Sequence, residues 1–138
     1  MIYAVIDTNV LVSALLTSND ESATAGVLNA VLDGRITPLY HRDILIEYED
    51  VLSRPKFNLS EDNIERLLGM IIKYGIEVFP KPSGEIFVDL DDLIFYEVAY
   101  EKKDDGSFLV TGNKKHFPVK DFIVSPSEMI KILDDIQL

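Results

Sequence analysis

The feature that most limits the fold of this chain is the alternation of short apolar runs with amphipathic stretches. Five runs have the length and composition of strands: Ile2 to Asp7, Ile36 to Tyr40, Ile76 to Phe79, Phe108 to Thr111 and Phe122 to Val124. Helical periodicity marks the segments near Val10 to Leu16, Ser22 to Leu32, Arg42 to Leu52, Glu61 to Tyr74, Asp92 to Glu101 and Pro126 to Leu133. Strands that alternate with helices are typical of a mostly parallel sheet covered on both faces. We therefore expect an α/β fold, a three-layer α/β/α sandwich with about five central strands.

Length and composition narrow the classes of protein and of site. A chain of 138 residues, 47% of them hydrophobic, suits one domain spanning residues 1–138. We expect a cytoplasmic protein, because no apolar run approaches the length of a membrane span and the first residues lack the basic start of a secretory signal. With no cysteine and two histidines, any metal would be held by oxygen ligands, which Mg²⁺ and Mn²⁺ prefer.

The first apolar run ends in a carboxylate, Asp7, followed by Thr8 and Asn9. We expect Thr8 or Asn9 to cap the next helix. Ligands in open α/β sheets collect at the carboxyl ends of the strands, where Asp7 would lie. On its own, Asp7 can equally be a plain turn or cap residue.

Two further groups of acids are candidates for the same edge of the sheet. In the segment from Arg42 to Leu52, Glu47 and Glu49 flank an apolar stripe on opposite sides, and periodicity does not choose between them. The second group, Asp89, Asp91 and Asp92, begins a later helix. Helix capping and the helix dipole explain one or two of these three acids better than all of them.

The fourth apolar run leads into Thr111, Gly112 and Asn113, which place short polar groups at the edge expected for Asp7. The basic residues Lys114, Lys115 and His116 follow directly. The formal net charge of −11 argues against a nucleic-acid binder, since phosphate contacts normally rest on a basic patch. Bound divalent cations reverse the local field, however. An acidic surface also suits a basic protein partner.

Four blocks in the same order resemble the PIN-domain family, most closely its toxin–antitoxin branch related to the VapC ribonucleases. The blocks are Asp-Thr-Asn-Val-Leu-Val-Ser-Ala from Asp7, Glu47 with Val51-Leu52-Ser53-Arg54-Pro55-Lys56-Phe57, Asp92-x-x-Phe with Glu97 and Ala99, and Val-Thr-Gly-Asn-Lys-Lys-His-Phe-Pro from Val110. The resemblance runs from Met1 to about Glu128.

The resemblance implies a role for each matching position. Asp7, Glu47 and Asp92 match the metal-binding, catalytic acids of the family, which use Mg²⁺ or Mn²⁺. Thr8, Asn9, Thr111 and Gly112 match the small residues that support the pocket. Asn113 stands where many relatives have a fourth acid, so it would bind a second metal less firmly. Lys114, Lys115 and His116 would guide an RNA backbone.

The resemblance thus implies a metal-dependent endoribonuclease that hydrolyses RNA phosphodiesters, a toxin controlled by a separately encoded antitoxin. The alternative is a PIN-like module with weak or no activity that binds RNA or a partner protein. A receiver-like signalling domain is a third reading, disfavoured because no phosphoacceptor Asp ends a central strand. The apolar segments Val27 to Leu32 and Ile64 to Ile72 predict either a homodimer face or simple core packing.

Overall fold

The structure, a computed structural model, describes residues 1–136 and has at its centre a parallel sheet of five strands. The strand order is β3-β2-β1-β4-β5, and all four pairings are parallel. The strands are β1 (Ile2–Ile6), β2 (Ile36–Tyr40), β3 (Ile76–Glu77), β4 (Phe108–Val110) and β5 (Ile123–Val124). The expected parallel α/β sheet of about five strands is confirmed.

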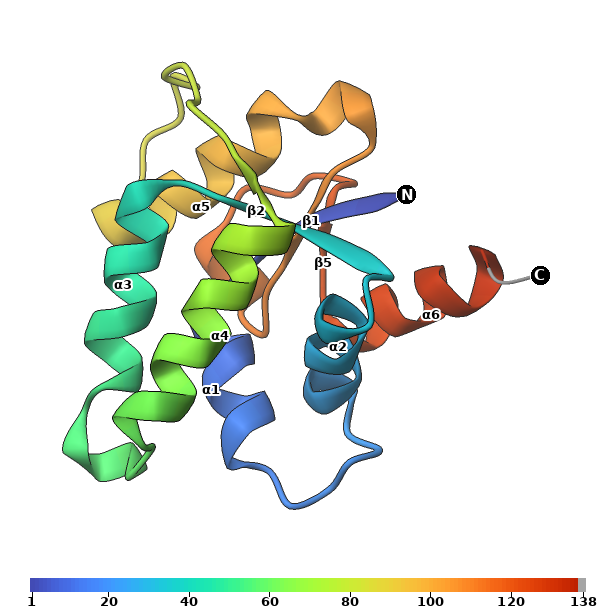
Figure 1. Cartoon of the computed structure of the whole chain (residues 1–138). Helices are drawn as coiled ribbons and strands as arrows, with labels where there is room; N and C mark the ends of the chain where they lie inside the picture. Colours follow the sequence, from blue (N-terminus) through green and yellow to red (C-terminus); the bar gives the residue numbers. More distant parts are fainter. Residues whose placement is uncertain (137–138) are drawn as a thin grey trace.

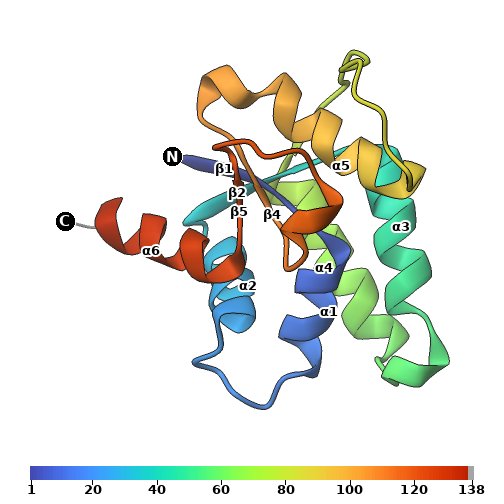
Figure 2. The ribbon, with the colours of Figure 1, turned by 180° about the vertical axis from the view of Figure 1, so that it is seen from behind.

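Helices cover both faces of this sheet. They are α1 (Thr8–Leu16), α2 (Ala23–Leu32), α3 (Arg42–Leu52), α4 (Glu61–Tyr74), α5 (Leu90–Glu101) and α6 (Pro126–Ile136), with short 3-10 turns at Pro55–Phe57, Lys103–Asp105 and Lys114–His116. In Figures 1 and 2 the strands lie between α5 on one side and α1, α2, α4 and α6 on the other. Helix α3 stands at one side of the sheet and contacts α1, α4 and α5.

The core forms where the β-branched faces of the strands meet the apolar stripes of the helices. Val5 and Leu109 are fully buried on adjacent strands, and Ile44, Tyr48 and Phe95 close the core from α3 and α5. Burial of this apolar surface is the main force that holds the layers together.

The helix boundaries follow their sequence signals closely. Ser60 caps α4 by accepting a hydrogen bond from the Asn63 amide at 3.1 Å. Gly75 follows the last residue of α4. Only glycine fits there, because a Cβ would lie 2.4 Å from the Ile71 carbonyl oxygen and 2.6 Å from that of Pro38. Ser125 and Glu128 bond reciprocally at the start of α6, which is a capping box.

Three local expectations were wrong. Helix α1 begins at Thr8, so Asp7 occupies the cap position, and neither Thr8 nor Asn9 caps it. Helix α5 begins at Leu90 rather than Asp92, because Asp89 caps it by accepting from the Asp91 amide at 2.9 Å. Strand β3 is two residues shorter than expected, since its pairing with β2 involves only Ile76 and Glu77.

The two apolar segments weighed as a homodimer face mainly pack inward. Val27, Val31, Leu67 and Ile71 are buried in the core, which accounts for most of their apolar character. Within residues 1–136, no helix is long and apolar enough to cross a membrane.

Candidate metal centre

Asp7 sits at the carboxyl end of β1, beside the end of β4. The register pairs Ile6 with Val110, so Asp7 and Thr111 leave the sheet side by side. The Asp7 amide donates to the Val110 carbonyl at 2.9 Å, and the Asp7 carboxylate accepts from the Thr111 hydroxyl at 2.7 Å. Thr111 Oγ1 in turn accepts from the Asn113 amide at 3.0 Å. Two neighbouring strand ends thus orient one buried carboxylate.

Burial makes the charged form of Asp7 unfavourable. The residue is only 7% exposed, and this desolvation raises the pKa of its carboxyl above the usual value. The Thr111 hydroxyl, the Thr8 backbone and the charge of His116 act in the opposite direction but do not cancel the effect of burial. A cation beside Asp7 would relieve this penalty.

A buried tyrosine anchors the strand end that carries Asp7. The Tyr48 hydroxyl of α3 donates to the carbonyl of Ile6, the residue before Asp7. Burial raises the pKa of Tyr48, so the phenol stays neutral and keeps its proton for this bond. Tyr48 also packs against Phe95 of α5, with ring centroids 6.0 Å apart. Sequence reasoning placed Tyr48 only in the apolar stripe; a phenol in that stripe, which needs a buried partner, was the available signal.

Asp92 approaches Asp7 from the first turn of α5. Partial burial, followed by the negative charges of Asp89 and Asp7, raises the pKa of Asp92 to about 6. The Asp92 carboxylate lies 3.5 Å from Nδ1 of His116. The negative charge of Asp7 is therefore one of the causes that make the charged form of Asp92 unfavourable.

Glu47 is half-buried on the side of α3 that faces the start of α5. Burial, then the charges of Asp91 and Asp50, raise the pKa of Glu47, whereas Arg54 lowers it. Neither Asp7 nor Asp92 is among the charges that act on Glu47. The acids at the start of α5 whose charges act on Glu47 are thus Asp91 and Asp89.

The residues after Thr111 have different surroundings from one another. Nδ2 of Asn113 lies 3.0 Å from Nε2 of His116; an amide that donates to Nε2 leaves the proton on Nδ1, which faces Asp92. His116 therefore lies beside Asp92, which sequence reasoning did not foresee. Gly112 is exposed and open, with nothing within 4 Å of a Cβ position.

The two lysines of this segment have different surroundings: Lys114 forms an ion pair, and Lys115 lines a cleft. Lys114 Nζ pairs with Glu128 Oε1 at 2.9 Å. The Ser125 amide and this lysine together lower the pKa of Glu128 to about 2. Lys115 instead lines a cleft of 370 Å³ together with Asp89, Asp92 and His116.

Two glutamates of α5 hold one wall of that cleft in place. Glu97 Oε2 accepts from the Ser83 amide at 2.6 Å, and Glu101 Oε1 accepts from the Lys81 amide at 2.9 Å. These bonds tie the loop that precedes α5 to the helix itself. The role of Glu97 is thus visible only in the tertiary structure.

The donor set around Asp7 and Asp92 fits a hard divalent cation. Across residues 1–136, no three Asp, Glu or His side chains already converge as a complete metal cluster. Asp7 and Asp92, two carboxyl groups with raised pKa values, nevertheless supply the kind of oxygen ligand that Mg²⁺ and Mn²⁺ require. The buried Thr8 hydroxyl beside Asp7 has no hydrogen-bond partner within the described chain. Asn9, by contrast, is exposed.

Comparisons with known proteins agree with this architecture. The chain is 28% identical over 123 residues to the uncharacterized protein MJ1680 of Methanocaldococcus jannaschii, covering 87% of this chain and 76% of that protein. The crystal structure of PAE2754 from Pyrobaculum aerophilum superposes with a TM-score of 0.58 at 15% identity, covering 98% of this chain and 90% of that one. This second likeness concerns the fold. A family profile described as PIN domain matches residues 3–115. The chain therefore belongs to the PIN-domain family, whose members are generally nucleases.

Proposed function

We propose that this protein is a Mg²⁺- or Mn²⁺-dependent endoribonuclease whose active site is built on Asp7 and Asp92. The observation that carries the proposal is a buried Asp7 at the carboxyl edge of a parallel sheet whose charge acts on Asp92, with the pKa values of both carboxyl groups raised. Acids whose pKa values are shifted by burial and by neighbouring charges are common at catalytic sites. The family match supports nuclease chemistry over the other functions that such an edge can serve.

The proposed roles follow the contacts of each side chain. Asp7 and Asp92 hold the cation, and Thr111 fixes the rotamer of Asp7 through its 2.7 Å hydrogen bond. Glu47 on α3 is the third candidate ligand, and the charge of Asp91 at the start of α5 acts on it. Asn113, a neutral ligand at most, contributes less. When bound, the cation supplies Lewis-acid stabilisation of phosphate charge and activates water for in-line hydrolysis.

The substrate strand would enter by the cleft beside Asp92. Lys115 at this cleft provides a positive charge for the phosphate backbone, and His116 lies between Asp92 and Asn113. Lys114 contributes less to this task, because Glu128 already neutralises it. This assignment reconciles an overall negative charge with a polyanionic substrate.

The test is cleavage of an end-labelled single-stranded RNA by the purified protein. We expect cleavage with Mn²⁺, none with a chelator, and a loss of at least about 100-fold in Asp7→Asn and Asp92→Asn. Asp134→Asn, an exposed acid on α6, is the matched control and should retain activity. Equal rates in all four proteins would reject the proposal.

We further propose that the protein is a cytoplasmic toxin restrained by a separately encoded antitoxin, as in the branch it resembles. Induced expression should then arrest bacterial growth with the parent protein and not with Asp7→Asn. Normal growth with a protein that cleaves RNA in vitro would reject the toxin role and retain the nuclease.

A PIN-like binding module is the second candidate, favoured by two observations. Asn113 is neutral, and Glu47 does not join Asp7 and Asp92 in a complete cluster. Calorimetric titration with Mn²⁺ discriminates between the two. A module would bind RNA or a partner equally well in Asp7→Asn and show no Mn²⁺ binding that this substitution removes.

A further inference from the structure

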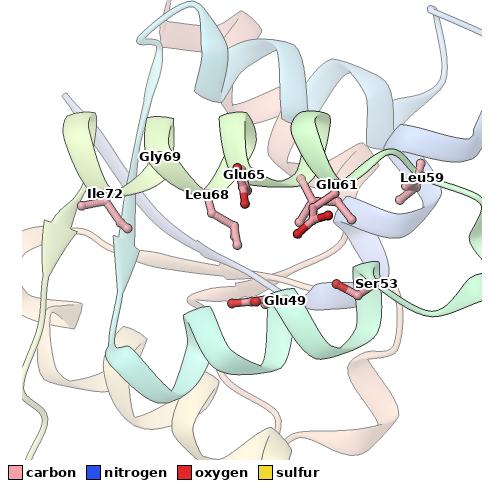
Figure 3. Close-up of a pocket in the computed structure, with 9 residues that line it drawn as sticks. Glu49, Ser53, Leu59, Glu61, Glu65, Leu68, Gly69 and Ile72 are labelled. Atoms are coloured by element: carbon pink, nitrogen blue, oxygen red, sulfur yellow. The ribbon is translucent and has the colours of Figure 1, made fainter.

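A second hollow lies on the flank of α3 that faces away from Glu47. This groove, with a volume of 540 Å³, runs between α3 and α4 (Figure 3). Glu49 and Ser53 line it from α3, and side chains of α4 point toward them from the other side. None of the acids assigned to the metal centre lines it, so the groove is a separate surface.

The floor of the groove is apolar. Leu68 and Ile72 of α4 form part of this apolar lining, and Leu59 lies at one end of the groove (Figure 3). Ile72 is 51% exposed although it belongs to a helix whose other face is well packed. An exposed isoleucine in a groove loses its contact with water only if something docks there.

A glycine leaves room along the groove. Gly69 lies inside α4, where glycine destabilises a helix by roughly 0.5 to 1 kcal/mol relative to alanine. A Cβ at this position would have nothing within 4 Å, and no unusual backbone angle requires glycine there. Neither internal packing nor conformation therefore explains Gly69, whereas close approach of another chain would.

All the charged side chains that line the groove are acidic: Glu49, Glu61 and Glu65. Glu61 and Glu65 stand one turn apart on α4, an arrangement of like charges that weakens a helix slightly. None of the three carboxylates forms an ion pair with another residue of the part of the chain described, 1–136. Their charges are thus free to meet cations from outside.

We propose that the groove between α3 and α4 binds a basic amphipathic helix of a partner protein. The stretch from Glu61 to Ile72 spans about 16 Å, so it matches about three turns of a docked helix. The apolar face of that helix packs on Leu68 and Ile72 and passes close to Gly69, while its Lys or Arg side chains meet the three glutamates. This surface is independent of the nuclease proposal.

The charges favour this occupant over two others. An RNA strand would place its phosphates against unpaired carboxylates. A second copy of the chain, with a net charge of −11, would face the same repulsion. The negative field that repels an RNA strand and a second copy of the chain attracts a basic helix.

The test is a titration of the full-length, ¹⁵N-labelled protein with two synthetic twelve-residue helical peptides. Both carry the same leucines on one face, with lysines on the other face of the first and glutamates on that of the second. We expect the lysine peptide alone to shift the amide signals of α3 and α4. Gly69→Leu, which fills the groove with a better helix former, should weaken binding at least 10-fold.

A matched pair of charge reversals separates the groove from general acidity. Glu61→Lys with Glu65→Lys should weaken binding at least 10-fold, whereas Asp134→Lys with Asp135→Lys on α6 makes the same change in net charge and should weaken it less than 2-fold. Equal losses in the two double variants, no loss in Gly69→Leu or no binding by the lysine peptide would overturn the proposal. So would a dimer in sedimentation velocity that Gly69→Leu dissociates, or the same shifts with an RNA oligonucleotide. Peptide binding by Asp7→Asn keeps this test separate from the nuclease test.

Discussion

Glu47 and Glu49 stand two residues apart on α3, yet the two flanks of that helix are different environments. On the Glu47 side, burial and the acids of α5 raise the pKa of the carboxyl. On the other side, Glu49 is exposed and lines a groove whose floor is apolar. The comparison shows that the surroundings of a carboxylate depend on which element packs against its side of the helix. We propose a cation as the ligand of the crowded acids and a partner helix as the ligand of the exposed ones.

The largest expected effect concerns Tyr48, the buried residue between Glu47 and Glu49 on α3. Tyr48→Ala removes a buried ring and should lower the free energy of unfolding by about 3 to 5 kcal/mol. Tyr48→Phe keeps the ring but leaves the Ile6 carbonyl without its donor, so we expect a loss of about 1 to 2 kcal/mol. Urea denaturation measures both. Similar losses for the two variants would show that the hydroxyl, rather than ring packing, holds α3 against β1.

The next largest effect comes from the same substitution made on each flank of α3. Glu47→Gln should reduce RNA cleavage by about 10- to 100-fold, since it removes the negative charge of a proposed metal ligand. Glu49→Gln is the matched control on the groove side and should leave the cleavage rate unchanged. Rates measured at saturating Mn²⁺ decide the matter; equal losses would erase the functional difference between the flanks.

The pH dependence of stability tests whether the acids on the Glu47 side of α3 destabilise the folded protein when they are charged. Asp92 has a pKa of about 6 in the folded protein, above its value of about 4 in an unfolded chain, so the folded state binds the proton more tightly. In a chelator, stability should therefore rise as the pH falls from 7 to 5. Asp92→Asn should flatten this slope and stabilise the protein at pH 7 by about 1 kcal/mol, a value reduced for solvent screening.

Urea denaturation at several pH values checks this slope, with Glu49→Gln as the control that should parallel the parent protein. A slope that survives unchanged in Asp92→Asn would assign the pH dependence to another group.

The smallest effect concerns the groove flank alone. Ser60→Ala removes the cap of α4 and should lower stability by about 1 kcal/mol. Because α4 carries none of the proposed metal ligands, the rise in Tm that we expect with Mn²⁺ should be the same as in the parent protein. A smaller rise in thermal denaturation would mean that the two flanks are coupled through the helix pair.

Much of the fold was predictable because local signals agreed with the global arrangement. The cap at Ser60, the glycine at the end of α4 and the Ser125 to Glu128 start signal all lie where the structure uses them. The errors fell where long-range contacts override local preference. Asp7, rather than Thr8 or Asn9, occupies the cap position of α1, and its carboxylate is held by Thr111, 104 positions away.

The candidate site was predictable in its members and less so in its arrangement. The family resemblance named Asp7, Glu47 and Asp92, and the family match supports the resemblance. It did not indicate that the charge of Asp7 acts on Asp92 and not on Glu47, nor that His116 lies beside Asp92. Those relations depend on how elements distant in the chain pack at the sheet edge.

The sequence by itself determined the alternation of strands and helices, the parallel sheet and the oxygen-rich chemistry available at its edge, because periodicity and residue type are local properties. Only the tertiary structure decided which acids are crowded and which are open, because burial and repulsion depend on elements distant in the chain. The contrast between Glu47 and Glu49 is the clearest case: helical periodicity puts them on opposite flanks, and the packing of α5 and α4 against α3 gives each flank its own surroundings.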